Sequence, residues 1–356
     1  MTPWMLYGAY GYTGRLIARD AVLRGLAPTL AGRDRDRVGA VARELGLDHR
    51  VFVLDRGEQA TAAHLAGMAL VLNCAGPFSA TGAPMMDACL RARAHYLDIT
   101  GEIAVFEQAH DRDAQARSEG VVLCPGVGFD VVPTDCVAAA LKAALPDATH
   151  LRLGFDVRSA VSPGTARTAV EGAALGGQVR RGGRIVPVPH GHRTRRIDFG
   201  EGGERTAVTI AWGDVSTAYY TTGIPNIEVY AAVPPAAAAA LRLGLGGLMG
   251  RLLAVPSVRN AVARRAGAAA RGPDAEARAG QPSFVWGEAE DASGARRVCR
   301  MRLANAYDVT VSASLAVVAS LLDRPPATGG GFITPSRLMG QDFASRLPGS
   351  GEMRVT

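Results

Sequence analysis

The chain has 356 residues, of which 48% are hydrophobic and 20% are charged, and this composition is typical of a folded globular protein rather than a disordered one. Because the length exceeds the usual size of a single hydrophobic core, we expect two domains. The formal net charge is +6, but the arginines that produce it are scattered and form no basic run with interleaved aromatic residues, so we expect no nucleic-acid partner.

The five cysteines are odd in number, lie far apart and show no CxxC spacing. This pattern argues against a disulfide framework and a zinc site, so we predict reduced thiols, a cytoplasmic location and no bound metal. The apolar stretch from Trp4 to Tyr7 runs directly into glycines, and no run of about 18 apolar residues occurs, so we expect neither a secretory signal nor a membrane span.

The first part of the sequence alternates short apolar runs with helix-like stretches, which is the pattern of a parallel sheet covered by helices on both faces. The expected strands are 5–7, 29–31, 51–54, 69–73, 95–98 and 121–123, and the expected helices are 15–24, 35–45 and 85–94. This order predicts an α/β fold of the Rossmann type, a doubly wound parallel sheet, over residues 1–146.

After about Pro146 the pattern changes, because strands follow one another without regular crossover helices. We expect strands at 151–157, 206–212, 227–232, 284–290 and 297–304, a loop leading into a helix at 162–177, a long loop or irregular hairpin at 182–203, and a helix at 311–322 stopped by Pro325-Pro326. These elements predict a second α+β domain, on a mixed or antiparallel sheet, over residues 147–327.

The segment 234–268 is rich in alanine and leucine and is interrupted by glycines and by Pro256, near which we expect two helices to meet. Arginines punctuate its apolar residues, which suits a helix pair in peripheral contact with a membrane, a partner or an acyl substrate. The alternative, which we favour, is a helix pair that covers the sheet of its own domain.

A glycine-rich segment, Gly8-Ala9-Tyr10-Gly11-Tyr12-Thr13-Gly14, lies directly between the first expected strand and the first expected helix. Here the backbone must turn sharply and approach a pyrophosphate closely, which a β-carbon would obstruct, while the following helix offers free N–H groups to the anion. We therefore predict a dinucleotide-binding loop rather than a merely structural turn. The expected contacts are Gly8, Tyr10, Gly11, Tyr12, Thr13 and Gly14.

The residue after the second strand decides which dinucleotide is bound, because it faces the adenosine ribose. The sequence there is Gly32-Arg33-Asp34-Arg35. The Arg33 guanidinium can hold a 2′-phosphate, so we favour NADPH. In the alternative, Arg33 is a surface residue, Asp34 accepts from the ribose 2′-hydroxyl, and the cofactor is NADH.

Further candidates follow the later strands, since ligands of open α/β sheets lie at the carboxyl ends of the strands. Asp55 either accepts from the adenine amino group or caps the following turn. The next loop offers small residues that would let the nicotinamide ribose pass against the backbone, although an ordinary turn is the alternative. These small residues are Cys74, Ala75, Gly76 and Pro77.

Two more loops carry polar side chains. In the loop after the fifth strand we expect Thr100 and Gly101 to contact the cofactor, whereas Asp98 and Glu102 either face the ligand or cap a helix. In the loop 126–135, Asp130 lies where it should face the nicotinamide, unless capping of the next helix by Thr134 or Asp135 is all that the segment does.

These segments together resemble the saccharopine dehydrogenase-like oxidoreductase family, in particular its short bacterial members and the trans-acting enoyl reductases. The likeness rests on the glycine loop and on 31–33, 73–78, 96–102, 126–135, 162–165, 221–226 and 331–335. It implies a Rossmann domain completed by a C-terminal tail, residues 328–356, a mixed-sheet second domain, a homodimer through that sheet, and NAD(P)-dependent reduction. The length, and the lack of lysines at the candidate site, depart from true saccharopine dehydrogenases.

We expect hydride transfer from NADPH to an activated C=C or C=N bond, with Asp130, Glu102 or Tyr220 as proton donor or substrate anchor. A short-chain dehydrogenase would need a Tyr-x-x-x-Lys pair, and the one lysine, Lys142, has Ala138 in place of that tyrosine. A redox sensor or scaffold that binds NADPH without turnover is the alternative from another class. A metal hydrolase is disfavoured because His190 and His192 lack a clustered third ligand.

Overall fold

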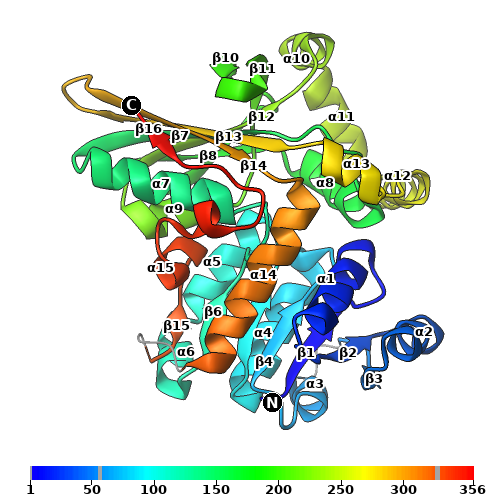
Figure 1. The fold of residues 1–356 in the computed structure, drawn as a ribbon. Coiled ribbons are helices and arrows are strands. Elements are labelled where there is room, and N and C mark those ends of the chain that lie inside the picture. Colours follow the sequence, from blue (N-terminus) through cyan, green and yellow to red (C-terminus); the bar gives the residue numbers. More distant parts are fainter. Residues whose placement is uncertain (1, 55–57, 325–328) are drawn as a thin grey trace. The chain divides into compact units, whose positions relative to one another are not determined.

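The computed structural model describes residues 2–54, 58–324 and 329–356, and the chain forms two compact units (Figure 1). The first unit comprises Met1–Thr100, Ala104–Asp130 and Thr310–Pro335, and the second comprises Gly101–Ile103, Val131–Val309 and Ser336–Thr356. Asp55 and the Pro325-Pro326 pair, both singled out in the sequence, lie outside the described residues.

The first unit is built on a parallel sheet of seven strands in the order β15-β6-β5-β4-β1-β2-β3. The strands are β1 Trp4–Tyr7, β2 Thr29–Gly32, β3 His49–Val51, β4 Leu70–Asn73, β5 His95–Asp98, β6 Val122–Cys124 and β15 Gly331–Phe332. The strand order reverses between β1 and β4, and both pair in parallel. The predicted doubly wound fold is therefore confirmed, with its switch point at the carboxyl ends of β1 and β4.

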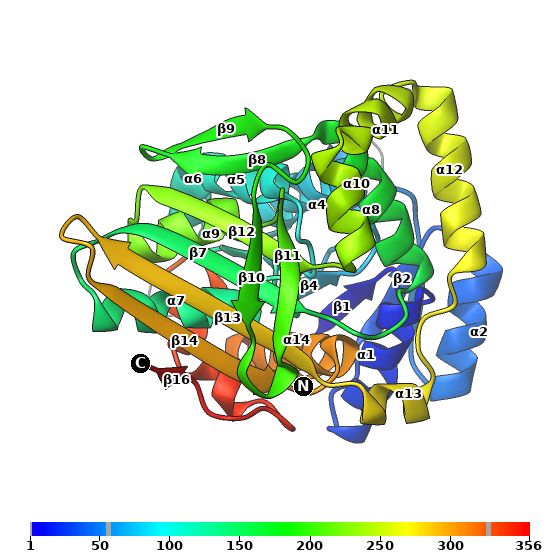
Figure 2. The same ribbon diagram turned by 90° about the horizontal axis from the view of Figure 1, so that it is seen from above.

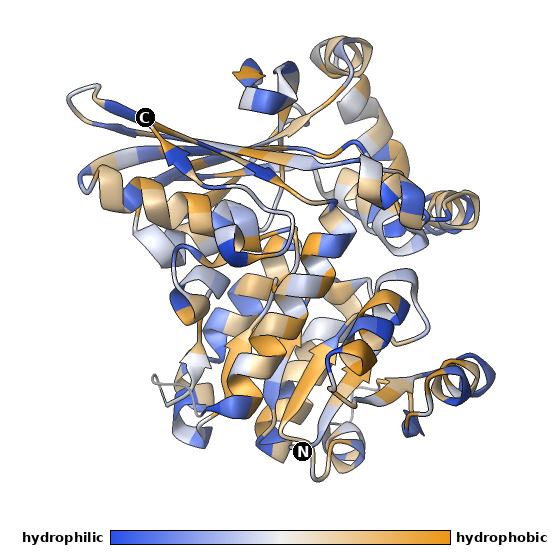
Figure 3. Cartoon of the chain, in the orientation of Figure 1, coloured by the Kyte–Doolittle hydropathy of each residue, from blue (hydrophilic) through white to orange (hydrophobic). Residues whose placement is uncertain are grey.

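The helices of the first unit follow the strands in alternation. They are α1 Tyr12–Leu23, α2 Arg35–Leu45, α3 Glu58–His64, α4 Phe78–Ala92, α5 Ile103–Asp111, α6 Asp113–Glu119 and most of α14 Ala306–Asp323. The strands β1 and β4 are buried along their whole length, as a parallel sheet covered on both faces requires, and Figure 3 shows their hydrophobic colouring. Chemistry on this sheet is therefore confined to the loops.

Several predicted bounds in the first unit are wrong. The third strand is 49–51 instead of 51–54, and α4 begins at Phe78, seven residues before the predicted start. Pro84 removes one helical hydrogen bond. The helix nevertheless continues through it, because the buried Met85 and Met86 pack into the core. The sequence analysis did not predict α3, α5 and α6.

The second unit is built on a mixed sheet in the order β10-β11-β12-β7-β13-β14-β16, with β8 pairing with β12 and with β9 (Figure 2). The strands are β7 Ala148–Asp156, β8 Gly177–Arg181, β9 Arg184–Val188, β10 Thr194–Asp198, β11 Glu204–Ile210, β12 Asn226–Ala232, β13 Ser283–Asp291, β14 Arg296–Leu303 and β16 Arg354–Val355. Only β7 and β12 pair in parallel within this sheet as described. The predicted mixed sheet is therefore confirmed.

The helices of the second unit include two that cover one face of this sheet. They are α7 Val132–Ala144, α8 Pro163–Leu175, α9 Asp214–Thr222, α10 Pro235–Arg242, α11 Leu245–Leu253, α12 Pro256–Ala269, α13 Ala275–Gly280 and α15 Pro335–Met339, with 3-10 turns at Gly200–Gly202 and Phe343–Arg346. The covering helices are α7, which packs on β7, β13 and β14, and α9, which packs on β12 (Figure 1).

The two units do not divide the chain at the predicted boundaries of 146 and 327. The helix α7, expected in the first domain, belongs to the second unit because its apolar face lies on β13, where a Cβ on Gly287 would stand 2.5 Å from Val137. The tail is shared: β15 extends the parallel sheet beside β6, whereas Ser336–Thr356 belongs to the second unit and β16 pairs with β14.

Two loop-rich predictions of the second unit are also corrected. The segment 182–203 is more regular than predicted, since a two-residue turn at Gly182 and Gly183 joins β8 to β9 and β10 follows. The segment 234–268 holds three helices instead of two, and α11 and α12 pack on α8 rather than on the sheet.

By length and composition, α14 is able to cross a membrane, as is the bent pair formed by 235–241 and α11. In α14, however, 67% of the apolar window is buried. A buried core helix meets the same criteria, so this composition does not identify a membrane span.

Candidate functional site

The glycine loop joins β1 to α1 at the switch point of the parallel sheet. Gly8 has a φ of +82°, and a Cβ there would stand 2.8 Å from the backbone nitrogen of Ala75. A Cβ on Gly14 would stand 2.4 Å from the carbonyl oxygen of Gly8. Both positions therefore require glycine, because the loops after β1 and β4 are in backbone contact at Gly8 and the glycine loop contacts its own backbone at Gly14.

The first turn of α1 faces outward from this loop without a capping side chain. Gly11 is the N-cap residue, and its backbone N–H donates to the carbonyl of Gly8 at 3.0 Å. With no side-chain cap and no acidic residue in the first turn, this helix end keeps a positive dipole that favours a phosphate. The predicted contact of this loop with a pyrophosphate stays a prediction.

Two of the residues after β2 have different surroundings, because one caps a helix and the other is exposed. Asp34 is the N-cap of α2, where its Oδ1 accepts from the backbone N–H of Arg37 at 3.1 Å, while Arg33 is exposed. The Arg37 guanidinium lies 4.5 Å from the centre of the Tyr10 ring, and Gly32 leaves room for that ring, since a Cβ there would stand 2.5 Å from it. Tyr10, Arg33 and Arg37 thus gather beside the glycine loop.

Tyr7, at the end of β1, reports on the same corner. Its hydroxyl donates to the carbonyl of Phe52 at 3.3 Å. Burial, and secondarily the neighbouring Tyr10, raise the pKa of Tyr7 to about 12, although Arg33 acts in the opposite direction. The positive charge of Arg33 therefore acts on the pKa of Tyr7 at the end of β1, next to the glycine loop.

The loop after β4 is held by one amide side chain. The Asn73 Oδ1 accepts from the Ala75 N–H at 3.0 Å, and the Thr81 hydroxyl donates to the Ala75 carbonyl at 2.7 Å. The Gly76-Pro77 peptide bond is cis, and burial raises the pKa of the Cys74 thiol. The predicted contact of this loop with the nicotinamide ribose stays a prediction, but the loop is shaped by these bonds and by contact with Gly8.

Asp98 ties two loops together, and its predicted ligand-facing or helix-capping role stays a prediction. Its Oδ1 accepts from the backbone N–H groups of Thr100 at 3.0 Å and Gly126 at 2.8 Å, and its Oδ2 accepts from the Tyr96 hydroxyl at 2.6 Å. Burial, and then the Asp98 charge, raise the pKa of Tyr96 well above its usual range. Thr100 is thereby held in place for its predicted contact with the cofactor.

The loop that carries Asp130 is braced by α14 within the first unit. The Phe129 N–H donates to the Thr310 hydroxyl at 3.0 Å, and a Cβ on Gly128 would stand 3.0 Å from Thr310. Asp130 is half-buried at the end of this braced loop.

The expected capping of α7 by Thr134 or Asp135 is wrong. The N-cap of α7 is Val131, and the Thr134 hydroxyl donates to the Val131 carbonyl. Asp135 accepts instead from the Thr221 hydroxyl at 2.5 Å and from the Ser336 N–H at 2.8 Å. These partners are far away in the sequence, which is why no local pattern revealed them.

Tyr220 lies on α9, a helix that the sequence did not indicate. Its ring centre is 5.7 Å from that of Tyr219, and the Arg180 guanidinium lies 4.2 Å from the centre of the Tyr219 ring. The Arg180 Nε donates to the carbonyl of Val215 at 2.8 Å, so the guanidinium bridges β8 and α9. Much of the surroundings of Tyr220 is therefore aromatic and cationic packing.

Glu102 has a carboxylate neighbour that the sequence analysis missed. Burial, and secondarily the Glu102 charge, raise the pKa of Glu171 on α8, while Arg259 acts in the opposite direction. All three belong to the second unit, whereas Asp130 belongs to the first. No sequence signal links residues this far apart, so only the fold reveals the pair.

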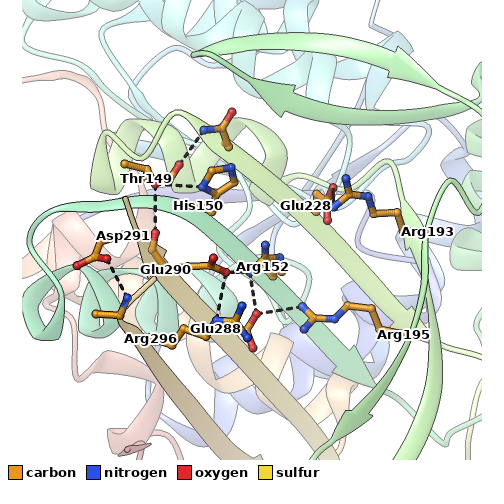
Figure 4. A network of polar contacts seen from close by, with 12 residues as sticks. Thr149, His150, Arg152, Arg193, Arg195, Glu228, Glu288, Glu290, Asp291 and Arg296 are labelled. Atoms are coloured by element: carbon orange, nitrogen blue, oxygen red, sulfur yellow. Dashed lines mark hydrogen bonds and ion pairs between the residues drawn. The ribbon is translucent and has the colours of Figure 1, made fainter. Parts of the chain in front are cut away.

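A separate polar cluster lies on the mixed sheet (Figure 4) and lines a depression of about 350 Å³. Arg152 donates to Glu288 at 2.8 Å and to Glu290 at 2.9 Å, and Arg195 donates to Glu288 at 3.1 Å. Arg193 pairs with Glu228 and Arg296 with Glu290. Since each of these arginines has a glutamate partner on a strand of the mixed sheet, we interpret the cluster as a structural network.

Among residues 2–54, 58–324 and 329–356, no three His, Cys, Asp or Glu side chains are grouped as metal ligands. His192 lies 2.9 Å from the Arg181 guanidinium, and among the described residues it belongs to no such group of three potential metal ligands.

Comparison with known proteins agrees with this geometry. Residues 4–124 match the family model of the saccharopine dehydrogenase NADP binding domain. Over 138 residues the chain is 35% identical to a trans-acting enoyl reductase of Mycobacterium leprae and 33% identical to one of Mycobacterium ulcerans. Each alignment covers 37% of this chain and 33% of the relative, so the likeness spans about a third of those proteins.

Solved structures resemble the whole chain in fold. Apo saccharopine dehydrogenase (L-Glu forming) from Saccharomyces cerevisiae matches with a TM-score of 0.62 at 10% identity, covering 100% of both chains. Homospermidine synthase from Legionella pneumophila in complex with NAD matches with a TM-score of 0.65 at 10% identity, covering 100% of this chain and 91% of the other. At this identity the likeness concerns the fold alone. Residues 4–124 are therefore similar to the saccharopine dehydrogenase NADP binding domain family, and the chain has distant similarity to trans-acting enoyl reductases.

Proposed function

We propose that this protein is an NADPH-dependent oxidoreductase that transfers hydride to an activated C=C or C=N bond of a small or carrier-bound substrate. The observation that carries the choice of cofactor is the arrangement after β2. Asp34 uses a carboxylate oxygen to cap α2, so it is poorly placed to serve as a ribose ligand, while the Arg33 guanidinium is exposed. An arginine at this point favours a 2′-phosphate over a 2′-hydroxyl.

The residues of the loop fit the diphosphate of such a cofactor. Gly8 and Gly14 leave backbone surface where any side chain would intrude, and the uncapped N-terminus of α1 offers its positive end to an anion. NADPH bound there supplies the hydride. The role of the protein is to hold the dinucleotide, to orient the substrate and to provide a proton.

Among the three candidate proton donors, Glu102 has the most suitable surroundings. Burial, and secondarily the Glu102 charge, raise the pKa of Glu171, so a second carboxyl group with a raised pKa lies within electrostatic reach of Glu102. Asp130 and Tyr220 are retained as substrate anchors. The enoyl substrate class is supported by the names of the relatives matched over residues of the first unit.

The cofactor is tested by titrating the purified protein with NADPH and with NADH, comparing the wild type with Arg33→Ala. Loss of a guanidinium–phosphate contact is expected to weaken NADPH binding about tenfold or more, which corresponds to ~1.4 kcal/mol, and to leave NADH binding nearly unchanged. Arg43→Ala, an exposed arginine in the last turn of α2, is the matched control and is expected to change neither affinity.

Two outcomes would contradict this assignment. Tighter binding of NADH than of NADPH, with loss of NADH affinity in Asp34→Ala, would favour the ribose-ligand alternative. An equal loss of both affinities in Arg33→Ala would show that the arginine supports the fold of the loop rather than the 2′-phosphate.

Turnover separates a reductase from a redox sensor. NADPH oxidation is followed at its absorbance band with enoyl thioesters, imines and carbonyl compounds as acceptors. Consumption of NADPH with any acceptor, lost in Glu102→Gln while NADPH affinity is retained, supports the proposed reaction. Binding of NADPH without consumption across this panel favours the sensor or scaffold. A cytoplasmic location and a homodimer through the mixed sheet complete the proposal, and sedimentation measures the latter.

A further inference from the structure

The three helices α10, α11 and α12 expose an unusual amount of apolar surface. Leu243 is 80% exposed, Met249 is 54% exposed, and five more leucines and valines between positions 245 and 262 are at least 39% exposed. These five are Leu245, Leu252, Val255, Val258 and Val262. Seven large apolar side chains exposed within twenty residues are more than the single exposed hydrophobic residues that are ordinary on a protein surface.

The exposed residues fall on one side of each helix. In α11 they are Leu245, Met249 and Leu252, which recur at helical spacing, and Leu253 of the same helix is buried. In α12 the exposed Val258 and Val262 recur in the same way, and Ala263 and Gly267 are buried. Both helices pack on α8 (Figure 2), and we call the exposed leucines, valines and Met249 of this segment the apolar ridge.

The charge around the apolar ridge has a single sign. Residues 234–271 contain six arginines and no aspartate or glutamate, so this short segment carries a charge equal to the +6 of the whole chain. The arginines are Arg242, Arg251, Arg259, Arg264, Arg265 and Arg271. Arg251 and Arg265 are exposed, and Arg265 follows Val258 and Val262 on the same helical face. Such a surface is complementary to an anionic one.

The same segment contains no phenylalanine, tyrosine or tryptophan. Protein interfaces are usually anchored by such aromatic residues, whereas leucine and valine beside arginine suit acyl chains beneath anionic headgroups. The axes of 235–241 and α11 differ by 73°, an arrangement that suits helices lying in the plane of a surface better than a straight span. A second copy of this chain would bring the same positive charge against itself.

We propose that the apolar ridge docks this protein peripherally on an anionic lipid bilayer, with the leucines and valines of α11 and α12 entering the interface and the arginines contacting the headgroups. This docking does not depend on the proposed reductase activity, since no residue of the ridge belongs to the predicted cofactor site.

The test is co-sedimentation with vesicles of phosphatidylcholine, with and without phosphatidylglycerol. We expect binding to the vesicles that contain phosphatidylglycerol, weakened by salt, and little binding to phosphatidylcholine alone. Leu245→Asp combined with Leu252→Asp is expected to weaken binding about tenfold or more, since two apolar side chains would no longer enter the interface. Leu23→Asp, which changes an 84% exposed leucine of α1, is the matched control and is expected to bind like the wild type.

A second variant separates charge from fold. Arg251→Glu combined with Arg265→Glu is expected to abolish the preference for phosphatidylglycerol while leaving NADPH affinity unchanged, which shows that the first unit is intact. The proposal is overturned if the wild type does not bind the anionic vesicles, or if the double leucine variant binds them as well as the wild type does. It is also overturned if the protein self-associates through the ridge, detected as concentration-dependent sedimentation that the leucine variant abolishes, in place of vesicle binding.

Discussion

The two sheets of this protein place their polar residues in opposite ways. In the parallel sheet, β1 and β4 are buried along their length and the polar groups stand in loops at the carboxyl ends. In the mixed sheet, charged residues stand within the strands and pair across them, and Arg152 lies directly opposite Glu288 in the register of β7 and β13.

This difference follows from what covers each sheet. A sheet buried on both faces cannot hold charges along its strands, so binding groups collect where the strands end. A sheet with one accessible face carries charges along its strands, and opposite charges on neighbouring strands then stabilise the pairing. A cluster of arginines is therefore not a binding site in itself. Its ability to bind an anion depends on whether carboxylates of the same protein already pair with the arginines.

The largest effect is expected at the switch point of the parallel sheet. Gly8→Ala places a Cβ 2.8 Å from the Ala75 nitrogen at a φ of +82°, so the loop must shift, and we expect NADPH affinity to fall about a hundredfold, or ~2.7 kcal/mol. Calorimetric titration measures this affinity.

The control for Gly8 is Gly25→Ala. Gly25 has a φ of +72° but no atom within 4 Å of an added Cβ, so this change carries the backbone strain without the collision. Its melting temperature should fall slightly and its NADPH affinity should not change. Equal affinity losses in the two variants would contradict the assigned role of the loop.

The next largest effect is expected in the mixed sheet, and on stability alone. Glu288→Ala leaves Arg152 and Arg195 without one of their partners, and the side chains of Glu288 and Arg152 are only 10% and 17% exposed. Breaking this largely buried pair is expected to destabilise the protein by about 2 to 3 kcal/mol in denaturant unfolding. NADPH affinity should stay at the wild-type value.

The pair of Arg196 and Glu204 is the matched control for that network, since both side chains are at least half exposed. Glu204→Ala is expected to leave the free energy of unfolding nearly unchanged. If Glu288→Ala abolished NADPH binding or activity without unfolding the protein, the cluster in Figure 4 would be a functional site instead of a structural one.

The smallest effect is expected for the substitution of Glu171, a half-buried carboxylate on α8. Its pKa is raised by burial and by Glu102, so the folded protein binds a proton there more readily than the unfolded chain does. Stability therefore falls as the pH rises from the ordinary glutamate pKa through the raised one. Glu171→Gln should raise the melting temperature slightly at pH 8 and hardly at all at pH 4.

The control for this prediction is Glu107→Gln on α5, which removes the same carboxylate charge from a half-buried position on another helix. A gain at pH 8 that Glu171→Gln and Glu107→Gln share would assign the effect to net charge. A loss of stability in Glu171→Gln at pH 8 would contradict the repulsion from Glu102.

The sequence predicted those parts of the fold in which the pattern is local. The alternation of buried strands and amphipathic helices placed α2 at its observed bounds and β5 likewise. It did not indicate α9, whose residues Thr217 to Thr222 include several types that favour strands but are held in a helix by packing against α7 and β12. Asp98 and Asp135 were also beyond reach, since their partners are backbone and hydroxyl groups from distant segments.

The sequence by itself determined the dinucleotide loop, because glycine is required wherever backbones approach as closely as they do at Gly8 and Gly14. It also determined the concentration of positive charge in 234–271. The folded structure was needed to learn that Asp34 caps a helix, that the Glu102 charge raises the pKa of Glu171, and that the arginines of the mixed sheet are paired. The steric requirement for a glycine can be inferred from a few adjacent residues, whereas the role of a charged residue depends on partners that come close only in the folded chain.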